Sequence, residues 1–254
     1  MISIVIPARD EARHIAGVLD RMLAAVRSGC EVLVVVDTAD DPTREVVLAS
    51  SVHEPRLHCL VSQYGPGPAS AIRYGIDHAA GDVVVVTMAD ESDDPRQIDD
   101  LAALVRAGAV VAAASRYAPG GRQAGGPVLK AALSRLAGRS LHLLARAGTT
   151  DATNSFKAYS ASFVREVGIE SRQGFAVGIE LTAKARRLRR PVAEIPTTWR
   201  ARTSGQSGFR LVRWLPSYLR WYLFCFGRRL SVPQLRARLA ADEIAAAGRI
   251  AAQP

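Results

Sequence analysis

Acidic side chains cluster directly after a short run of β-branched residues in the first half of the chain. Asp90, Ser92 and Asp93 follow Val83–Thr87 within a few positions. Neighbouring carboxylates repel one another unless a cation or hydrogen-bond donors hold them. Mg²⁺ and Mn²⁺ prefer oxygen ligands, and Mg²⁺ is commonly bound by one or two carboxylates plus substrate phosphates. The cluster is therefore a candidate divalent-metal site, with a solvated turn capped by the next aspartate as the alternative.

Polar residues also follow other strand-like runs. Asp37 comes directly after one of them and is a candidate acceptor for a nucleobase edge or a ribose; its alternative role is to form a turn. Glu11 either contributes to the same site or complements the positive end of a helix. The glycines of Gly65–Ala71 precede a helix, so their amides either approach a phosphate or form a tight turn. Four such strand ends would make one site if they converge.

The elements that must position these residues alternate along the chain. Apolar runs predict buried strands at Ile2–Ile6, Glu31–Val36, Leu57–Val61, Val83–Thr87 and Ala109–Ala114. Apolar residues at helical spacing predict helices at Glu11–Arg27, Thr43–Ser50, Ala69–Ala79 and Gln97–Arg106. This alternation predicts an α/β domain with a mostly parallel sheet, in which ligands bind beyond the carboxyl ends of the strands.

The second half of the chain is more helical. Its patterns predict helices at Leu129–Ala147 and Phe175–Leu188, a strand at Val192–Ile195, and an Ala-rich helix at Ser231–Ala252 that opens with the capping pattern of Ser231 and Gln234. The segment Gly208–Arg229 mixes aromatic residues with arginines, a composition typical of an amphipathic segment on an anionic membrane surface. A helix packed back on the domain, with a solvated basic face, is the alternative. The longest apolar run in this segment is too short to span a bilayer.

Length and composition limit the possible functions. The 254 residues are enough for one sizeable domain, so we expect a single active site. The net charge of +9 is typical of proteins that meet phosphates, but nucleic-acid binding is not expected from charge alone. The five histidines and three cysteines show no metal-ligand spacing, and no secretory leader precedes Ile2, so a cytoplasmic protein is expected. The sequence does not indicate an oligomeric state.

Taken in order, several segments resemble family 2 glycosyltransferases, within them the dolichol-phosphate mannosyltransferase-like, or polyprenyl-phosphate glycosyltransferase, branch. The matching segments are IVIPARDE, VVVDTADDPT, GPGPASAIRYGIDHAAGD, VVTMADESDDP, SRYAPGG, DATNSFKAY, GFAVGIEL and AEIPTTWRARTSGQS. The resemblance implies a single GT-A (Rossmann-like) nucleotide-sugar-binding domain over residues 1–207 and an amphipathic helical tail over residues 208–254. It implies an inverting enzyme that moves a sugar from a nucleotide-diphosphate sugar to a polyprenyl phosphate with Mg²⁺ or Mn²⁺. Such an enzyme would be peripherally associated with the cytoplasmic membrane.

The resemblance also assigns roles to individual residues. The donor-binding set is Pro7, Ala8, Arg9, Glu11, Asp37, Ala89, Asp90, Arg116 and Arg202. The metal set is Asp90, Ser92 and Asp93, and the catalytic set is Asp90, Arg116, Arg202 and Glu180. The acceptor-binding set is Lys157 and Ser207.

The chain departs from the family pattern at the metal motif. The usual Asp-x-Asp reads Met88-Ala89-Asp90, so the first carboxylate is missing and Ser92 or Asp93 is expected to compensate. The acid that usually precedes the site arginine is replaced by Ala201.

Other functions stay open on the sequence. A glycosyltransferase with a hydroxyl acceptor would need a general base, and no Glu-Asp pair stands where such members carry it. The residues Arg210–Trp214 mimic the RxxRW of processive synthases. A sugar nucleotidyltransferase would need a glycine-rich loop and a lysine after the first strand, which PARDEA lacks. A non-catalytic sugar-nucleotide binder fits the loss of a carboxylate at Met88.

Overall fold

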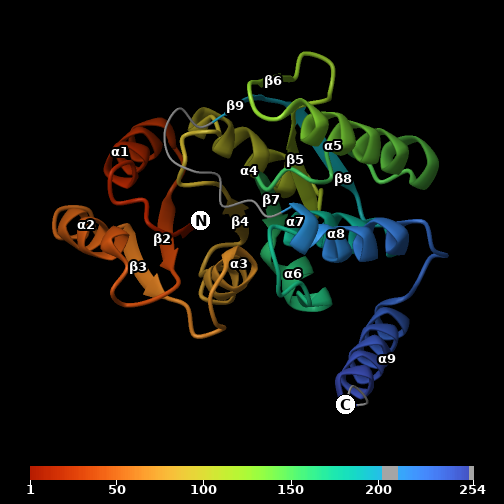
Figure 1. The fold of residues 1–254 in the computed structure, drawn as a ribbon. Coiled ribbons are helices and arrows are strands. Elements are labelled where there is room, and N and C mark those ends of the chain that lie inside the picture. Colours follow the sequence, from red (N-terminus) through yellow and green to blue (C-terminus); the bar gives the residue numbers. More distant parts are fainter. Residues whose placement is uncertain (202–210, 252–254) are drawn as a thin grey trace.

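A seven-stranded sheet forms the centre of the protein (Figure 1). The computed structural model describes residues 1–201 and 211–251, without the side chains of 211–212 and 243–251. The strand order is β3-β2-β1-β4-β7-β5-β8. The strands are β1 (Ile2–Ala8), β2 (Cys30–Val36), β3 (Leu57–Val61), β4 (Val83–Val86), β5 (Val111–Ser115), β7 (Lys157–Ser160) and β8 (Val192–Pro196). All but β7 run parallel, which confirms the predicted class of sheet.

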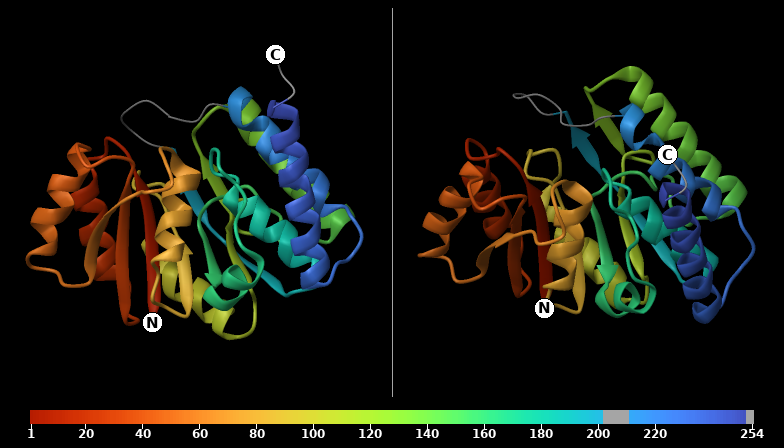
Figure 2. Two further views of the ribbon diagram at one scale, coloured as in Figure 1. Left: turned by 90° about the horizontal axis from the view of Figure 1, so that it is seen from below. Right: turned by 60° about the horizontal axis from the view of Figure 1, so that its bottom comes forward.

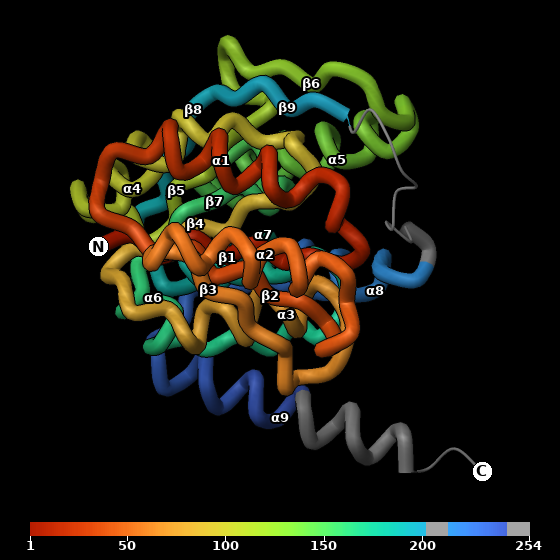
Figure 3. The backbone as a smooth tube through the Cα atoms, turned by 90° about the vertical axis from the view of Figure 1, so that its left-hand side faces the viewer, coloured from red at the N-terminus to blue at the C-terminus, as the bar shows by residue number. Residues whose placement is uncertain are grey.

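Helices cover both faces of the sheet and divide the core into two layers. One layer packs α1 (Ile15–Ala25), α2 (Pro42–Ser51) and α4 (Ile98–Arg106) against one face. The other packs α3 (Pro68–Asp77), α6 (Ala161–Val167) and α7 (Val177–Arg187) against the opposite face. Figure 3 shows α1 and α4 on one side of the sheet and α3 and α6 on the other. The inner strands β1, β2, β4 and β5 are therefore buried on both faces, as their continuous apolar runs predicted, whereas the edge strands β3 and β8 are only partly buried.

Strand β7 was not predicted. It lies between β4 and β5 and runs antiparallel to both. Its sequence, KAYS, has no β-branched residue and begins with a lysine, so it lacks the apolar run that marks the other strands. A second, two-stranded sheet of β6 (Arg122–Ala124) and β9 (Thr198–Arg200) was also unexpected; both strands have only three residues.

The C-terminal helices pack on the domain. Helix α5 (Val128–Ser140) continues into the π-helical turn η2 (Leu141–Ala145), so the long predicted helix exists but changes its winding. Helix α8 (Leu211–Cys225) packs against α7 and buries Trp221, with 1% of its surface exposed (Figure 2). Helix α9 (Val232–Ala251) begins with the predicted reciprocal bonds between Ser231 and Gln234. The predicted domain boundary at 207/208 lies outside the described residues.

Two helical glycines should respond in opposite ways to alanine. Gly75 brings α3 against β1 and β2, where an added Cβ would overlap Val5 and lie 3.0 Å from a methyl of Val35. Gly17 is exposed on α1, and nothing lies within 4 Å of an added Cβ. We expect Gly75→Ala to lower the free energy of unfolding by about 1–3 kcal/mol through overpacking. Gly17→Ala should raise it by up to about 1 kcal/mol because alanine favours a helix. Urea unfolding measures both, and equal shifts would contradict this packing.

Candidate active site

The acidic loop lies at the carboxyl edge of the sheet, after β4. The Asp90 carboxylate accepts a hydrogen bond from the Ser92 amide at 3.2 Å. Asp93 accepts from the Thr87 hydroxyl at 2.9 Å and from the Met88 amide at 3.1 Å. Burial, and then the charge of Asp90, raise the pKa of Asp93 to about 7. The two carboxylates are thus close enough to repel each other, as expected of a site that gains stability from a cation.

The loop offers oxygen atoms that fit a divalent ion. The Ser92 side chain is buried, and its hydroxyl oxygen has no hydrogen-bond partner. The described residues contain no group of three or more His, Cys, Asp or Glu side chains that would enclose a metal by themselves. The oxygens of Asp90, Ser92 and Asp93 would therefore form one side of a site that substrate phosphates and water complete, the usual arrangement for Mg²⁺. Next to this loop, Asp94 caps the following turn, the role given by the alternative interpretation.

The loops after β1 and β2 flank the acidic loop, because β1 lies between β2 and β4. The Asp37 carboxylate accepts the Gly67 amide at 2.8 Å, and its other oxygen lies 3.9 Å from the exposed Arg9 guanidinium. This use of the Gly67 amide favours the tight turn over a phosphate cradle. Pro7 and Ala8 end β1 and are buried, as is Ala89 beside Asp90.

Bonds to the start of α2 fix the Arg9–Glu11 loop. The Glu11 amide donates to the Thr43 hydroxyl at 2.9 Å, and the Asp10 amide donates to Asp41 at 3.2 Å. Asp10 has a φ of 56°, in the left-handed region that is costly for residues with a side chain. The loop is therefore held in one conformation between β1 and α2.

Arg116 lies at the end of β5 and is held by Asp151. Its Nε and Nη2 donate to the two carboxylate oxygens at 2.6 and 2.8 Å, and Asp151 is fully buried. Burial alone would raise the pKa of Asp151, but the bonds and charge of Arg116 lower it. Arg116 also donates to Ser134 of α5 at 3.1 Å. Asp151 was not among the predicted site residues, although it lies in a segment that carried the family resemblance.

Lys157 and Glu180 lie in the interior. The Lys157 ammonium donates to the backbone carbonyls of Asp151, Ala152 and Asn154, and burial lowers its pKa to about 8. Glu180 accepts the amides of residues 170 and 171 and pairs with Lys184 at 2.7 Å. Both side chains are fully buried, so they shape the loops around the site rather than line an open surface. Arg202 and Ser207 lie outside the described residues.

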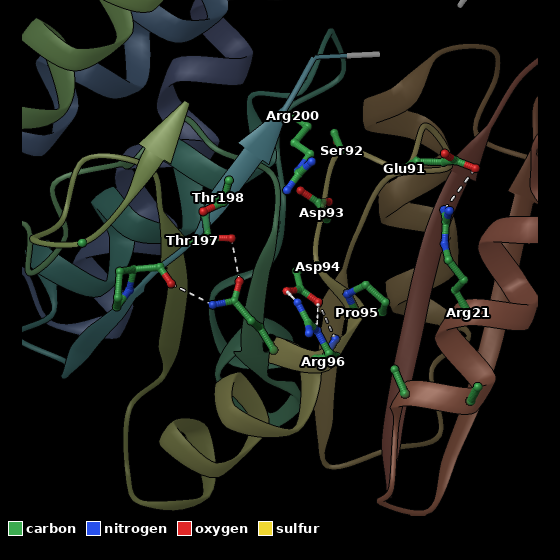
Figure 4. Close-up of a pocket in the computed structure, with 15 residues that line it drawn as sticks. Arg21, Glu91, Ser92, Asp93, Asp94, Pro95, Arg96, Thr197, Thr198 and Arg200 are labelled. Atoms are coloured by element: carbon green, nitrogen blue, oxygen red, sulfur yellow. Dashed lines mark hydrogen bonds and ion pairs between the residues drawn. The ribbon is translucent and has the colours of Figure 1, made fainter. Parts of the chain in front are cut away.

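A pocket of about 810 Å³ adjoins the acidic loop on the side of α1 and β9 (Figure 4). Ser92 and Asp93 line one wall, and Arg200 points toward Asp93. The Arg200 amide also donates to the Ser92 carbonyl at 3.3 Å, which holds β9 over the loop. Arg200 was not among the predicted site residues, and the available signal was its position two residues before Arg202 in a segment that carried the family resemblance.

The mostly parallel sheet, with helices on both faces and polar loops at its carboxyl edge, is that of a GT-A domain. The chain belongs to glycosyl transferase family 2, whose model matches residues 3–168.

Relatives and solved structures agree with this membership. The chain is 28% identical to an undecaprenyl-phosphate mannosyltransferase of Micrococcus luteus, over 80% of this chain and 85% of that protein. It is 29% identical to a polyprenol monophosphomannose synthase of Mycolicibacterium smegmatis, over 80% and 79%. Glucosyl-3-phosphoglycerate synthase of Mycobacterium tuberculosis, solved with Mn²⁺ and UDP, has a similar fold, with a TM-score of 0.66 at 18% identity over 91% and 81%.

Removing the Arg116 side chain should cost stability as well as any contact with a donor. In Arg116→Ala the Asp151 carboxylate stays buried without its partner, so the free energy of unfolding should fall by about 3–5 kcal/mol. The double variant Arg116→Met, Asp151→Leu removes both charges and should recover most of that loss. Urea unfolding tests this, and wild-type stability of the single variant would contradict it.

Stability should also depend on pH through Glu170, the second carboxylate at Lys184. Burial, and then Glu180, raise the pKa of Glu170 from its ordinary 4.5 to about 7. Its contribution to stability is therefore complete below pH ~4.5 and is lost as the pH rises through ~7. From pH 5 to pH 8 the wild type should lose about 1–2 kcal/mol relative to Glu170→Gln. Parallel profiles in urea unfolding at the two pH values would contradict this.

Proposed function

We propose that the protein is an inverting glycosyltransferase that moves a sugar from a nucleotide-diphosphate sugar to a polyprenyl phosphate, with Mg²⁺ or Mn²⁺ as cofactor. The observation that carries the proposal is that the loops holding Asp37 and the acidic cluster follow β2 and β4, which run parallel, and therefore lie at the same edge of the sheet. Asp37 is proposed to accept hydrogen bonds from the nucleoside. The oxygens of Asp90, Ser92 and Asp93 are proposed to hold a metal that, when bound, would neutralise charge on the leaving diphosphate.

The state of two interior carboxylates, Glu180 and Asp151, supports a phosphate as the acceptor. A hydroxyl acceptor must lose a proton, whereas a phosphate monoester is already ionised at neutral pH. Burial would raise the pKa of Glu180, but the Lys184 ammonium and hydrogen bonds lower it. The hydrogen bonds and charge of Arg116 likewise lower the pKa of Asp151. Carboxylates in buried ion pairs with lowered pKa values are weak bases, so neither is suited to deprotonate a hydroxyl.

The proposed step forms one bond and breaks one. A phosphate oxygen of the lipid attacks the anomeric carbon, while the bond from that carbon to the diphosphate oxygen breaks with inversion. Arg116 and Arg202 are proposed to face the departing phosphates, as guanidinium groups suit phosphate oxygens. Pro7, Ala8, Arg9, Glu11 and Ala89 are proposed to surround the donor, and Lys157, Glu180 and Ser207 to shape the sugar and acceptor side.

We also propose that the enzyme works as a peripheral protein on the cytoplasmic membrane, where a polyprenyl phosphate would be anchored. The named substrates of the mannosyltransferase relatives support this assignment. None of the described helices is long and apolar enough to cross a membrane.

Calorimetric titration with GDP-, UDP- and dTDP-sugars, with and without Mn²⁺, tests the donor. Metal-linked binding of one nucleotide is the expected result and would identify the base. Absence of binding to all three would reject the transferase.

The Asp90→Asn variant tests catalysis, because it keeps the size of the side chain and removes its charge. We expect kcat for sugar transfer to fall by about 10²–10³-fold, the loss typical of removing one group that stabilises developing charge. Asp100→Asn, on the exposed side of α4, is the matched control and should behave as the wild type. Turnover that survives in Asp90→Asn would show that this carboxylate does not hold the metal.

A further inference from the structure

Exposed apolar side chains gather on one side of the molecule. Among the described residues fourteen large apolar side chains are exposed, and ten of them lie on α5, η2 and α8 or directly after α8. These ten are Val128, Leu129, Leu133, Leu136, Leu143, Leu144, Leu215, Leu219, Leu223 and Phe226. Single exposed leucines are ordinary on a soluble protein, but a concentration of this kind indicates an interaction surface.

The three segments form one surface, here called the α5–α8 face. The Ser140 hydroxyl at the end of α5 is 2.8 Å from the Tyr222 hydroxyl of α8, and the two helices lie side by side in Figures 1 and 2. The opposite sides of η2 and α8 are in the core, where η2 buries Leu141 and Ala145 and α8 buries Trp221. The exposed leucines are therefore not spare core residues.

The charge on this face has one sign. Residues 128–146 and 213–230 contain no aspartate or glutamate. Their exposed arginines are Arg135, Arg139, Arg146, Arg213, Arg220, Arg228 and Arg229. One of them, Arg220, lies 3.7 Å from Asp242 of α9. Exposed leucines interspersed with exposed arginines suit a surface that is apolar inside and anionic outside, which describes a bilayer with acidic lipids.

We propose that the α5–α8 face docks on an anionic lipid bilayer, and that α5 and η2 supply most of its apolar contacts. The inference rests on the proposed function, since it states how the active site would meet a membrane-anchored acceptor. The sequence had assigned membrane contact to Gly208–Arg229 alone. The face is also connected to the candidate active site, because Ser134 of α5 accepts a hydrogen bond from Arg116.

A second copy of the chain fits this face less well. In a two-fold symmetric dimer the same patch meets itself, so arginines would oppose arginines with no carboxylate between them. A lipid surface provides phosphate groups for each arginine and hydrocarbon for each leucine.

Vesicle co-sedimentation of the full-length chain tests the proposal. The test variant is Leu136→Glu with Leu144→Glu, which changes side chains that are 67% and 73% exposed on α5 and η2. The control is Leu48→Glu with Val52→Glu, 39% and 76% exposed in and just after α2. The wild type and the control should bind phosphatidylglycerol vesicles and bind phosphatidylcholine vesicles weakly, with binding that falls as salt is added. The test variant should bind at least about tenfold more weakly.

Three results would overturn the proposal. These are wild-type binding by the test variant, equal binding to both lipids, or a wild-type dimer in light scattering that the test variant dissociates. Circular dichroism confirms that each variant is folded.

Transfer to a short-chain polyprenyl phosphate dispersed in detergent separates this inference from the proposed function. Transfer by the wild type without face-dependent vesicle binding rejects only the docking face. Face-dependent vesicle binding without transfer rejects only the proposed reaction. If both hold, the test variant should keep its rate in detergent and lose it on vesicles.

Discussion

The ion pair between Arg116 and Asp151 connects three parts of the molecule. Arg116 directly follows β5, Asp151 belongs to the loop before β7, and Ser134 of α5 accepts a hydrogen bond from the same guanidinium. The Lys157 ammonium holds the same loop by donating hydrogen bonds to the backbone carbonyls of Asp151 and Ala152. Buried charges are costly unless they are paired and hydrogen-bonded, so these groups must keep their mutual geometry. The carboxyl edge of the sheet and the outer helix α5 are consequently held in one fixed relation.

The sequence predicted the part of this arrangement that depends on periodicity. β1, β2, β4 and β5 are apolar runs buried on both faces, and their parallel order places the polar residues that follow them at one edge. The positions of Asp37 and Asp90 follow from that rule alone. The tight turn at Gly67 and the cap at Asp94, both among the interpretations weighed for these residues, are also present.

Features that depend on long-range pairing could not be predicted in the same way. β7 is a strand because its backbone pairs with β4 on one side and with β5 on the other. Its buried lysine donates to carbonyls of the preceding loop, and the sequence pattern does not reveal that this lysine is buried. The partner of Arg116 lies 35 positions away. The role of Glu180 was likewise hidden, because its ion pair with Lys184 resembles an ordinary surface pair four residues apart until burial is known.

Helix α8 shows why one amphipathic segment satisfied two interpretations. Its aromatic residues face inward: the Trp221 indole donates to the Ser171 hydroxyl, whose backbone amide donates to Glu180. Leu215, Leu219 and Leu223 face outward. Membrane contact and packing on the domain are therefore compatible, since they use opposite sides of the helix. Because the inward side of α8 connects through Ser171 to the buried carboxylate of Glu180 on α7, the packing of α8 on the domain sets the direction in which these leucines point.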